Sequence, residues 1–436
     1  MGQFMRPTIK RFATAFFIFI FGICGPANAA GQDDDPPIRY VVRKGDTLIS
    51  LGDRYFRTSQ SYRIVQRQNR IIDPHRIPVG KILIFPRNML KYRPAVAELL
   101  SVRGQVTSGE GKLSTGQKLP EGTAIETGPS SFATMVLDDG SRISLPSNSA
   151  IRIRRLRTYI LGNILDYDFD VARGGIRSTV VKQKSPDDRY RVRTPKAVSA
   201  VRGTDFQSRF DTDSQNDFAE VVEGGLAVNA GGGDERSLPA GNGLSVKADG
   251  GVVTETLMVV PELRAPGKLQ SDKIVRFAAL ANLPIRYTIA ADSGFIEQVA
   301  DVIVPDGNAE FADLPDGNYF VRARAISANG LQGIPATFTF KRRMNSVTGS
   351  AGKEDTGYIF RWRAEGQGTQ RFHFQLFRNA VDTVAMVDEA GLDTQMITLS
   401  DLPPADYFWR VASVQYIDSE VAISWTPFEK ITVSAP

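Results

Sequence analysis

Hydrophobic and polar positions change their spacing several times along the chain, and the first clear pattern covers residues 38–86. Alternating side chains over Tyr40–Arg43 predict a strand, and the run Lys81–Pro86 predicts a second one. Between them, apolar residues at helical spacing predict one helix that starts at Leu48 and another over Tyr62–Asn69. The pattern therefore predicts a small unit with the order strand, helix, helix, strand.

From Ala97 to Val259 the pattern changes to short alternating strands separated by glycine-rich turns. The sequence Asp138-Asp-Gly-Ser141 lies between two alternating runs and predicts a hairpin. The phrases VARGGIRS and VVEGGLAV each predict a strand, a glycine bend and another strand. We therefore expect an all-β domain over residues 97–259.

Charged residues alternate within two neighbouring strands of this region. Arg152 and Arg154 lie in the first strand, and Asp166, Asp168 and Asp170 lie in the next. A turn between them would pair the strands in antiparallel fashion and set a row of arginines against a row of aspartates.

The last third of the chain repeats itself at a distance of 88 residues. The phrase Asp-Leu-Pro-x-x-x-Tyr begins at Asp313 and again at Asp401. A repeat of this length, made of short strands, has the size of an Ig-like sandwich. We expect two such sandwiches, over residues 262–343 and 350–436. The phrase resembles the tyrosine corner of fibronectin type III domains, which implies that each tyrosine hydroxyl ties down a loop.

One further stretch, VRTPKAVSAVRGTDF at residues 192–206, places an arginine among small and apolar residues. Strict alternation would put Arg202 on an apolar face of one continuous strand. A buried guanidinium must be paired, so we expect it to bond to backbone carbonyls or to an acid such as Glu220 or Glu223. A catalytic loop and a ligand clamp are the alternatives. The predicted structural hub consists of Arg202, Gly203 and Thr204.

The N-terminus has a different character from the rest. A basic segment with Arg6, Lys10 and Arg11 precedes an apolar run over Phe12–Ile23, and the small residues GPANAA follow. This is the pattern of a secretory signal peptide, which we predict over residues 1–30. An uncleaved membrane anchor is the alternative. A short acidic linker is predicted over residues 31–37. The only cysteine, Cys24, lies in this segment. Without the segment the chain has neither disulfides nor thiolates.

Charge is unevenly distributed along the chain. Removing Arg6, Lys10 and Arg11 leaves 50 basic side chains against 48 acidic ones, but residues 38–93 carry thirteen Lys or Arg and three Asp. This excess favours a polyanionic neighbour such as an envelope polymer or a membrane surface. Nucleic acid is not expected as a partner of an exported chain.

The region 38–93 resembles a LysM domain. Its matching features are Tyr40-x-Val42, the turn Gly45-Asp-Thr-Leu48, Asn69, Gly80 and the closing Ile84-Phe-Pro86. The resemblance implies binding of N-acetylglucosamine-containing glycan, which means peptidoglycan for an exported bacterial protein. It also implies a groove between the loops 45–48 and 70–77. The implied glycan-binding residues are Gly45, Asp46, Thr47, Leu48, Arg70, Ile71, Ile72, Asp73 and Ile77.

The region Leu99–Val246 resembles the FecR domain, on the sequence LPEGTAIETGPSSFATMVLDDGSRISLPSNSAIRI and on TPKAVSAVRGTDF. FecR domains are best known from the periplasmic part of regulators that begin with a cytoplasmic region and a membrane helix. This chain has a predicted signal peptide and a LysM-like unit in those places. The resemblance therefore implies an exported binding or scaffolding module, with a signalling role as the alternative.

The sequence contains no recognisable catalytic or metal-binding pattern. Its two histidines, His75 and His373, are isolated, so we expect them to be structural or solvent-facing rather than part of a catalytic triad, and the further ligands of a zinc site are lacking. The acids of DTDSQND lack the central glycine and the closing glutamate of an EF-hand loop. No cofactor or metal is expected.

The resulting prediction is a multidomain, mainly β, non-enzymatic protein of the bacterial cell envelope or periplasm. Its LysM-like unit would bind peptidoglycan, its FecR-like domain would act as a scaffold, and its Ig-like repeats would contact an envelope protein. A periplasmic FecR-type regulator is the second hypothesis, and a cell-wall hydrolase or its accessory is the third.

Overall fold

A computed structural model describes residues 35–436 apart from 110, 202, 232, 234, 265–266, 281, 382–383, 418–419 and 435–436. The predicted signal peptide, most of the predicted linker and Arg202 lie outside the described residues. The chain divides into two compact units, of which the first holds the chain up to Asp53 together with Thr58–Met89. The second holds Arg54–Arg57 and Leu90–Pro436. Among the described residues, no helix has both the length and the apolar character that crossing a membrane requires.

The first unit has the predicted order of strand, helix, helix and strand. Its two strands pair in antiparallel fashion, with Tyr40 opposite Leu83. Tyr40, Leu83, Leu51 and Val65 are buried, so the strands and both helices share one small core. The elements are β1 (Ile38–Val41), α1 (Leu48–Tyr55), the 3-10 helix η1 (Ser59–Ser61), α2 (Tyr62–Gln68), β2 (Ile82–Phe85) and the 3-10 helix η2 (Arg87–Met89).

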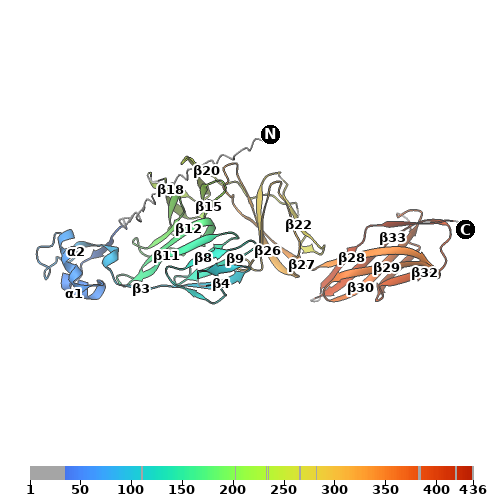
Figure 1. Cartoon of the computed structure of the whole chain (residues 1–436), viewed down its shortest axis with the longest axis horizontal. Coiled ribbons are helices and arrows are strands. Elements are labelled where there is room, and N and C mark those ends of the chain that lie inside the picture. The colour runs from blue at the N-terminus through green and yellow to red at the C-terminus, as the bar shows by residue number, and fades with distance from the viewer. Residues whose placement is uncertain are drawn as a thin grey trace, which may run out of the picture. The chain divides into compact units, whose positions relative to one another are not determined.

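The second unit begins with a closed barrel of eighteen described strands, β3 to β20 (Figure 1). Apolar residues alternate along most of these strands and fill one core, to which each fully buried Ile, Leu or Phe contributes about 1.5–3 kcal/mol. The strands are β3 (Tyr92–Pro94), β4 (Ala97–Arg103), β5 (Val106–Ser108), β6 (Gly111–Lys112), β7 (Lys118–Leu119), β8 (Ala124–Thr127), β9 (Phe132–Leu137), β10 (Arg142–Leu145), β11 (Ala150–Tyr159), β12 (Ile164–Thr179), β13 (Arg189–Arg193), β14 (Ala197–Val201), β15 (Asp205–Asp211), β16 (Asn216–Glu223), β17 (Gly225–Ala230), β18 (Glu235–Pro239), β19 (Asn242–Val246) and β20 (Val252–Thr256).

The longest strand, β12, connects the two parts of the barrel. Its first half pairs with β11 and β13, and its second half pairs with β10 and β15. The change of partners occurs at Gly174 and Gly175, the glycine bend that the sequence predicts. Gly174 has a φ of +70°, and a Cβ there would lie 2.5 Å from Oγ of Ser149. A residue without a side chain is therefore required where the strand turns from one layer into the other.

The rest of the second unit consists of four more sheets, two for each sequence repeat. The first repeat has the sheet β21-β27-β26-β23-β24 and the pair β22-β25; the second has β28-β29-β32 and a five-stranded sheet of β31, β30, β33, β34 and β35. The first repeat contains β21 (Leu269–Gln270), β22 (Val275–Ala278), β23 (Ile285–Ala290), β24 (Gln298–Val304), β25 (Asn308–Phe311), β26 (Gly317–Ala325) and β27 (Ala336–Arg342). The second contains β28 (Asn345–Glu354), β29 (Gly357–Gly366), β30 (Thr369–Arg378), β31 (Val387–Leu392), β32 (Met396–Leu399), β33 (Ala405–Ile417), β34 (Glu420–Trp425) and β35 (Glu429–Val433).

Both repeats form the tyrosine corner that their shared phrase predicts. The hydroxyl of Tyr319 donates to the carbonyl of Pro315 at 2.9 Å, and the hydroxyl of Tyr407 donates to the carbonyl of Pro403 at 2.8 Å. Both rings are buried at the start of a long central strand. The multidomain, mainly β fold class is thereby confirmed, while the exact domain boundaries stay a prediction.

Candidate functional site

The two loops of the predicted glycan groove lie side by side in the first unit. The backbone N–H of Leu48, at the start of α1, donates to the carbonyl of Pro74 at 2.8 Å. Pro74 belongs to the loop 70–77 that follows α2. This single hydrogen bond joins segments that are 26 positions apart, and both loops therefore contribute to one surface.

Local hydrogen bonds shape the first loop. Gly45 is exposed and has a φ of +90°, the left-handed region that favours glycine. The carboxylate of Asp46 accepts from the Tyr40 hydroxyl at 2.6 Å and from the Arg43 N–H at 2.8 Å. Both donors lie on the strand side of the turn, so Asp46 holds the turn closed.

Thr47 is the N-cap of α1. Its Oγ1 accepts from the N–H of Ser50 at 3.0 Å, and the Ser50 hydroxyl in turn accepts from the N–H of Thr47 at 3.0 Å. This reciprocal pair satisfies two helix-end donors. The side chains of Asp46 and Thr47 are thus engaged within the loop, whereas Gly45 is exposed and has nothing within 4 Å of a Cβ built on it.

The second loop is held at both ends. Arg70 is exposed with a φ of +50°, and the amide of Gln66 donates to the carbonyls of Ile71 and Ile72 at 3.1 and 3.3 Å. Asp73 accepts from the N–H of His75 at 2.9 Å. The loop therefore has a defined shape, and at its tip the Ile72 side chain is 98% exposed.

The nine predicted glycan-binding residues fall into two groups. Leu48, Ile71 and Ile77 are buried, so their side chains support the loops from below and only their backbone can face a ligand. The other six have partly or fully exposed side chains or, for glycine, backbone: Gly45, Asp46, Thr47, Arg70, Ile72 and Asp73.

A shallow groove of about 470 Å³ along α2 adds residues that the sequence reasoning missed. It continues from Arg70 and Ile71 over the exposed face of the helix, where Arg63 lies 6.0 Å from the centre of the Tyr62 ring. An aromatic ring beside several hydrogen-bond donors is a common surface for binding sugars. The added residues are Tyr62, Arg63, Gln66 and Arg67. In the sequence, this groove is indicated by a tyrosine followed by arginines in the segment that forms α2.

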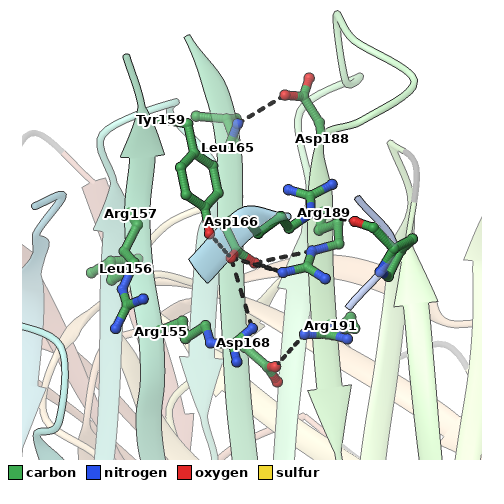
Figure 2. Close-up of polar contacts among 12 residues, drawn as sticks. Arg155, Leu156, Arg157, Tyr159, Leu165, Asp166, Asp168, Asp188, Arg189 and Arg191 are labelled. Carbon is green, nitrogen blue, oxygen red and sulfur yellow. Dashed lines mark hydrogen bonds and ion pairs between the residues drawn. The ribbon is translucent and has the colours of Figure 1, made fainter. Parts of the chain in front are cut away.

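The second unit holds a buried charge cluster around β12, which Figure 2 shows. Asp166 and Asp168 are completely buried. Arg189 donates to both carboxylate oxygens of Asp166 at 2.8 Å, and the hydroxyl of Tyr159 donates to the same group at 3.1 Å. Arg191 donates to Asp168 at 2.8 Å. Both carboxylates are therefore neutralised by hydrogen-bonded guanidinium groups, as burial requires.

The predicted row of arginines on β11 does face the row of aspartates on β12, and Arg155 lies 3.8 Å from Asp166. A register shift between Ile153 and Arg155 leaves the exposed Arg154 out of this pairing, 3.8 Å from the half-exposed Asp170. The principal partners of the buried aspartates lie on β13, which runs parallel to β12 with Asp166 opposite Arg189. The cluster is saturated by internal pairs, so it holds strands together and has no free acid for catalysis.

The prediction of one continuous strand over the stretch 192–206 is wrong. β14 ends at Val201, and β15 begins at Asp205. Between them Gly203 has a φ of +72°, and a Cβ there would lie 2.8 Å from Cα of Lys182. The burial pattern changes phase at this break, because close backbone packing of the chain around Lys182 forces a turn that only glycine accommodates.

Of the predicted hub, Thr204 is buried, and its hydroxyl donates to the carbonyl of Gly225 at 3.0 Å. Glu220, one of the acids proposed for Arg202, pairs with Arg209 at 2.7 Å. Arg202 is outside the described residues, so its pairing stays a prediction. Among the described residues, no group of three His, Cys, Asp or Glu could hold a metal ion.

Two family models match the sequence. The model described as LysM domain matches residues 40–86, and the model described as FecR protein matches residues 123–227. No curated protein matches the chain.

Several solved structures share limited similarity with the chain. One is a putative anti-sigma factor from Parabacteroides distasonis ATCC 8503, with 18% identity and a TM-score of 0.26 over 31% of this chain and 59% of that one. The chain thus spans 59% of the length of that structure. Another is the FN1–FN3 part of chicken CNTN1, with 13% identity and a TM-score of 0.22 over 55% of this chain and 95% of that one. From the family models, residues 40–86 are a LysM domain and residues 123–227 are a FecR domain.

Proposed function

We propose that this chain is a non-enzymatic peptidoglycan-binding protein of the bacterial cell envelope. The LysM domain binds glycan that contains N-acetylglucosamine, and the FecR domain and the two Ig-like repeats are presented to an envelope partner. The observation that carries the proposal is the hydrogen bond from Leu48 to Pro74, which supports a shared surface for the two loops of the LysM groove. The thirteen basic residues in 38–93 add attraction to the acidic wall polymer.

This surface can bind a sugar largely through backbone groups and an apolar contact, with few polar side chains. The backbone around Gly45 approaches a ligand without steric hindrance, since nothing lies within 4 Å of a Cβ built at that position. Ile72 adds an apolar contact, and the groove along α2 adds hydrogen-bond donors from Arg67 and Arg70. These groups match a glycan, whose rings combine apolar faces with hydroxyl and amide edges.

Co-sedimentation of the purified full chain with peptidoglycan sacculi tests the proposal. We expect retention at moderate salt and release by soluble oligomers of N-acetylglucosamine. Retention that salt abolishes and that these oligomers leave unchanged would mean purely electrostatic adhesion and would refute glycan recognition. Zymography on the same material is expected to show no clearing, which separates a binding protein from a wall hydrolase.

A second candidate function is envelope signalling, which the match to the FecR protein model favours. A regulator of that kind would retain an N-terminal anchor. N-terminal sequencing of the protein recovered from the envelope distinguishes the two functions, because cleavage after about residue 30 supports an exported binding protein.

A further inference from the structure

A polar cavity lies between the barrel and the first repeat, within the second unit. Its volume is about 40 Å³, and four arginines line it: Arg177 on β12, Arg286 on β23, and Arg322 and Arg324 on β26. A buried water needs roughly 10–15 Å³ of such space. The cavity therefore has room for about three waters or for one small oxyanion.

Two of these arginines are neutralised inside the protein. Arg177 forms a two-pronged pair with Asp205, with hydrogen bonds of 3.2 and 2.8 Å. Arg286 forms an equivalent pair with Asp301, at 2.9 and 2.8 Å. Their charges are thus balanced by their own carboxylates.

Within the described part of the chain, the other two arginines have no carboxylate within ion-pair distance. Arg324 is 4% exposed, and both of its terminal nitrogens are buried without a hydrogen-bond partner. Arg322 stacks over the ring of Phe295 at 3.7 Å, and its Nε also lacks a partner. Burial is the main cause that lowers the pKa of Arg322 to about 9, and it lowers the pKa of Arg324 well below the usual range.

The surrounding neutral groups are also unsatisfied. Gln332 is 1% exposed, and neither its amide nitrogen nor its amide oxygen has a partner. The acids that act electrostatically on these two arginines are Asp205 and Asp292 for Arg322, and Asp205 and Glu220 for Arg324. Glu220 is completely buried. One of its oxygens accepts from Arg209 and from the Gln332 N–H, while the other has no partner. Asp205 and Glu220 already pair with Arg177 and Arg209, and Asp292 accepts from the backbone N–H groups of Ile296 and Glu297. Among the described residues, neither Arg322 nor Arg324 therefore has a hydrogen-bonded counter-charge of its own.

We propose that this cavity is a binding site for a small oxyanion, held by the guanidinium groups of Arg322 and Arg324. Guanidinium forks match the geometry of phosphate, sulfate and carboxylate oxygens. The buried Arg324 and the part-buried Arg322, neither with a hydrogen-bonded carboxylate, favour an anion over water. The side-chain amide of Gln332 supplies an additional donor.

Such an anion would connect two parts of the second unit. Arg177 comes from the barrel and Arg324 from the first repeat, and the neighbouring Thr134 hydroxyl of the barrel already donates to the carbonyl of Ile296 at 2.9 Å. Binding would remove the repulsion among the guanidinium groups and would stabilise this contact by mass action.

Isothermal titration calorimetry of the full chain with inorganic phosphate, sulfate and acetate tests the site, with thermal unfolding as a second readout. We expect one oxyanion per chain, a rise in melting temperature, and at least a tenfold loss of affinity in Arg324→Gln. Arg276→Gln is the matched control, because it removes an equal charge from an exposed residue of the first repeat that pairs with Glu310. Its affinity should equal that of the unmodified chain.

The three titrants separate the sources of the anion. Binding of phosphate or sulfate identifies a tetrahedral group, and binding of acetate alone identifies a carboxylate; each supports an oxyanion site. No binding of any titrant would mean that the cavity holds water and would overturn the proposal, as would equal affinity in Arg324→Gln. If that variant fails to fold by circular dichroism, Arg322→Gln replaces it with the same expectations.

Discussion

Arg189 and Asp166 are joined by two hydrogen bonds of 2.8 Å between neighbouring parallel strands, and the carboxylate is completely out of contact with solvent (Figure 2). The pair joins β12 to β13 on the strand face opposite the barrel core, which holds Tyr167 and Tyr190. Since both side chains are buried, each charge depends on the other for its stability.

Removing one partner of this pair should strongly destabilise the barrel. Asp166→Ala leaves the Arg189 guanidinium buried without its counter-charge, and we expect a loss of about 3–5 kcal/mol in the free energy of unfolding. Urea denaturation of the barrel measures this loss. The control is Arg154→Ala, which breaks the exposed pair with Asp170 and should cost less than about 1 kcal/mol. Equal effects of the two variants would contradict the importance of burial.

The two tyrosine corners should contribute equally to their repeats. Tyr407→Phe and Tyr319→Phe each remove one buried hydroxyl that bonds to a proline carbonyl, and each should cost about 1–2 kcal/mol. Thermal unfolding of the single variants checks this expectation. Tyr416→Phe serves as control, since this tyrosine of the same strand as Tyr407 is 47% exposed and should tolerate the change.

Gly203 offers a test of the break between β14 and β15. Gly203→Ala places a Cβ at 2.8 Å from the backbone of Lys182 in addition to a strained φ of +72°, and we expect a loss of about 2–4 kcal/mol. Gly231→Ala is matched to it, because that glycine has a similar φ of +65° but nothing within 4 Å. It should cost only about 1 kcal/mol. The difference between the two values, measured by chemical denaturation, isolates the steric contact.

The exposed Ile72 allows glycan binding to be separated from folding. Ile72→Ala removes an apolar contact from the loop tip and should weaken retention on sacculi by about three- to tenfold, while the melting temperature stays unchanged, because the side chain is 98% exposed. Ile64→Ala is the control: this residue lies on α2, is 42% exposed and does not line the groove. Unchanged retention in Ile72→Ala would place the glycan elsewhere on the domain.

Local sequence patterns determined much of the fold. The order of strand and helix in residues 38–86 follows from the change between periods of two and 3.6, because side-chain direction depends only on the local backbone. The tyrosine corners followed from a phrase that occurs twice, since each hydroxyl bonds to a carbonyl four residues upstream. The bend of β12 at Gly174 could likewise be expected from the glycines alone.

Tertiary structure decided which charges meet. A register shift between Ile153 and Arg155 reverses which arginines face β12, and the parallel pairing of β12 with β13 supplies Arg189 to Asp166. The local sequence predicts neither the register shift nor the parallel pairing. A shift of one residue moves the following side chains to the other face of the strand without any change in the sequence pattern. Burial of Leu48 beneath the loops of the predicted glycan groove likewise depends on packing.

The arginine-lined cavity shows most clearly which features follow from the sequence and which depend on tertiary structure. Arg322 and Arg324 follow ordinary strand alternation in the sequence, which places them on one face of β26. Only the folded second unit places them beside Arg177, which already forms an ion pair with Asp205. A sequence specifies where along a strand each charge lies, but the balance of charges within a cavity depends on strands that are distant in the chain and adjacent in space.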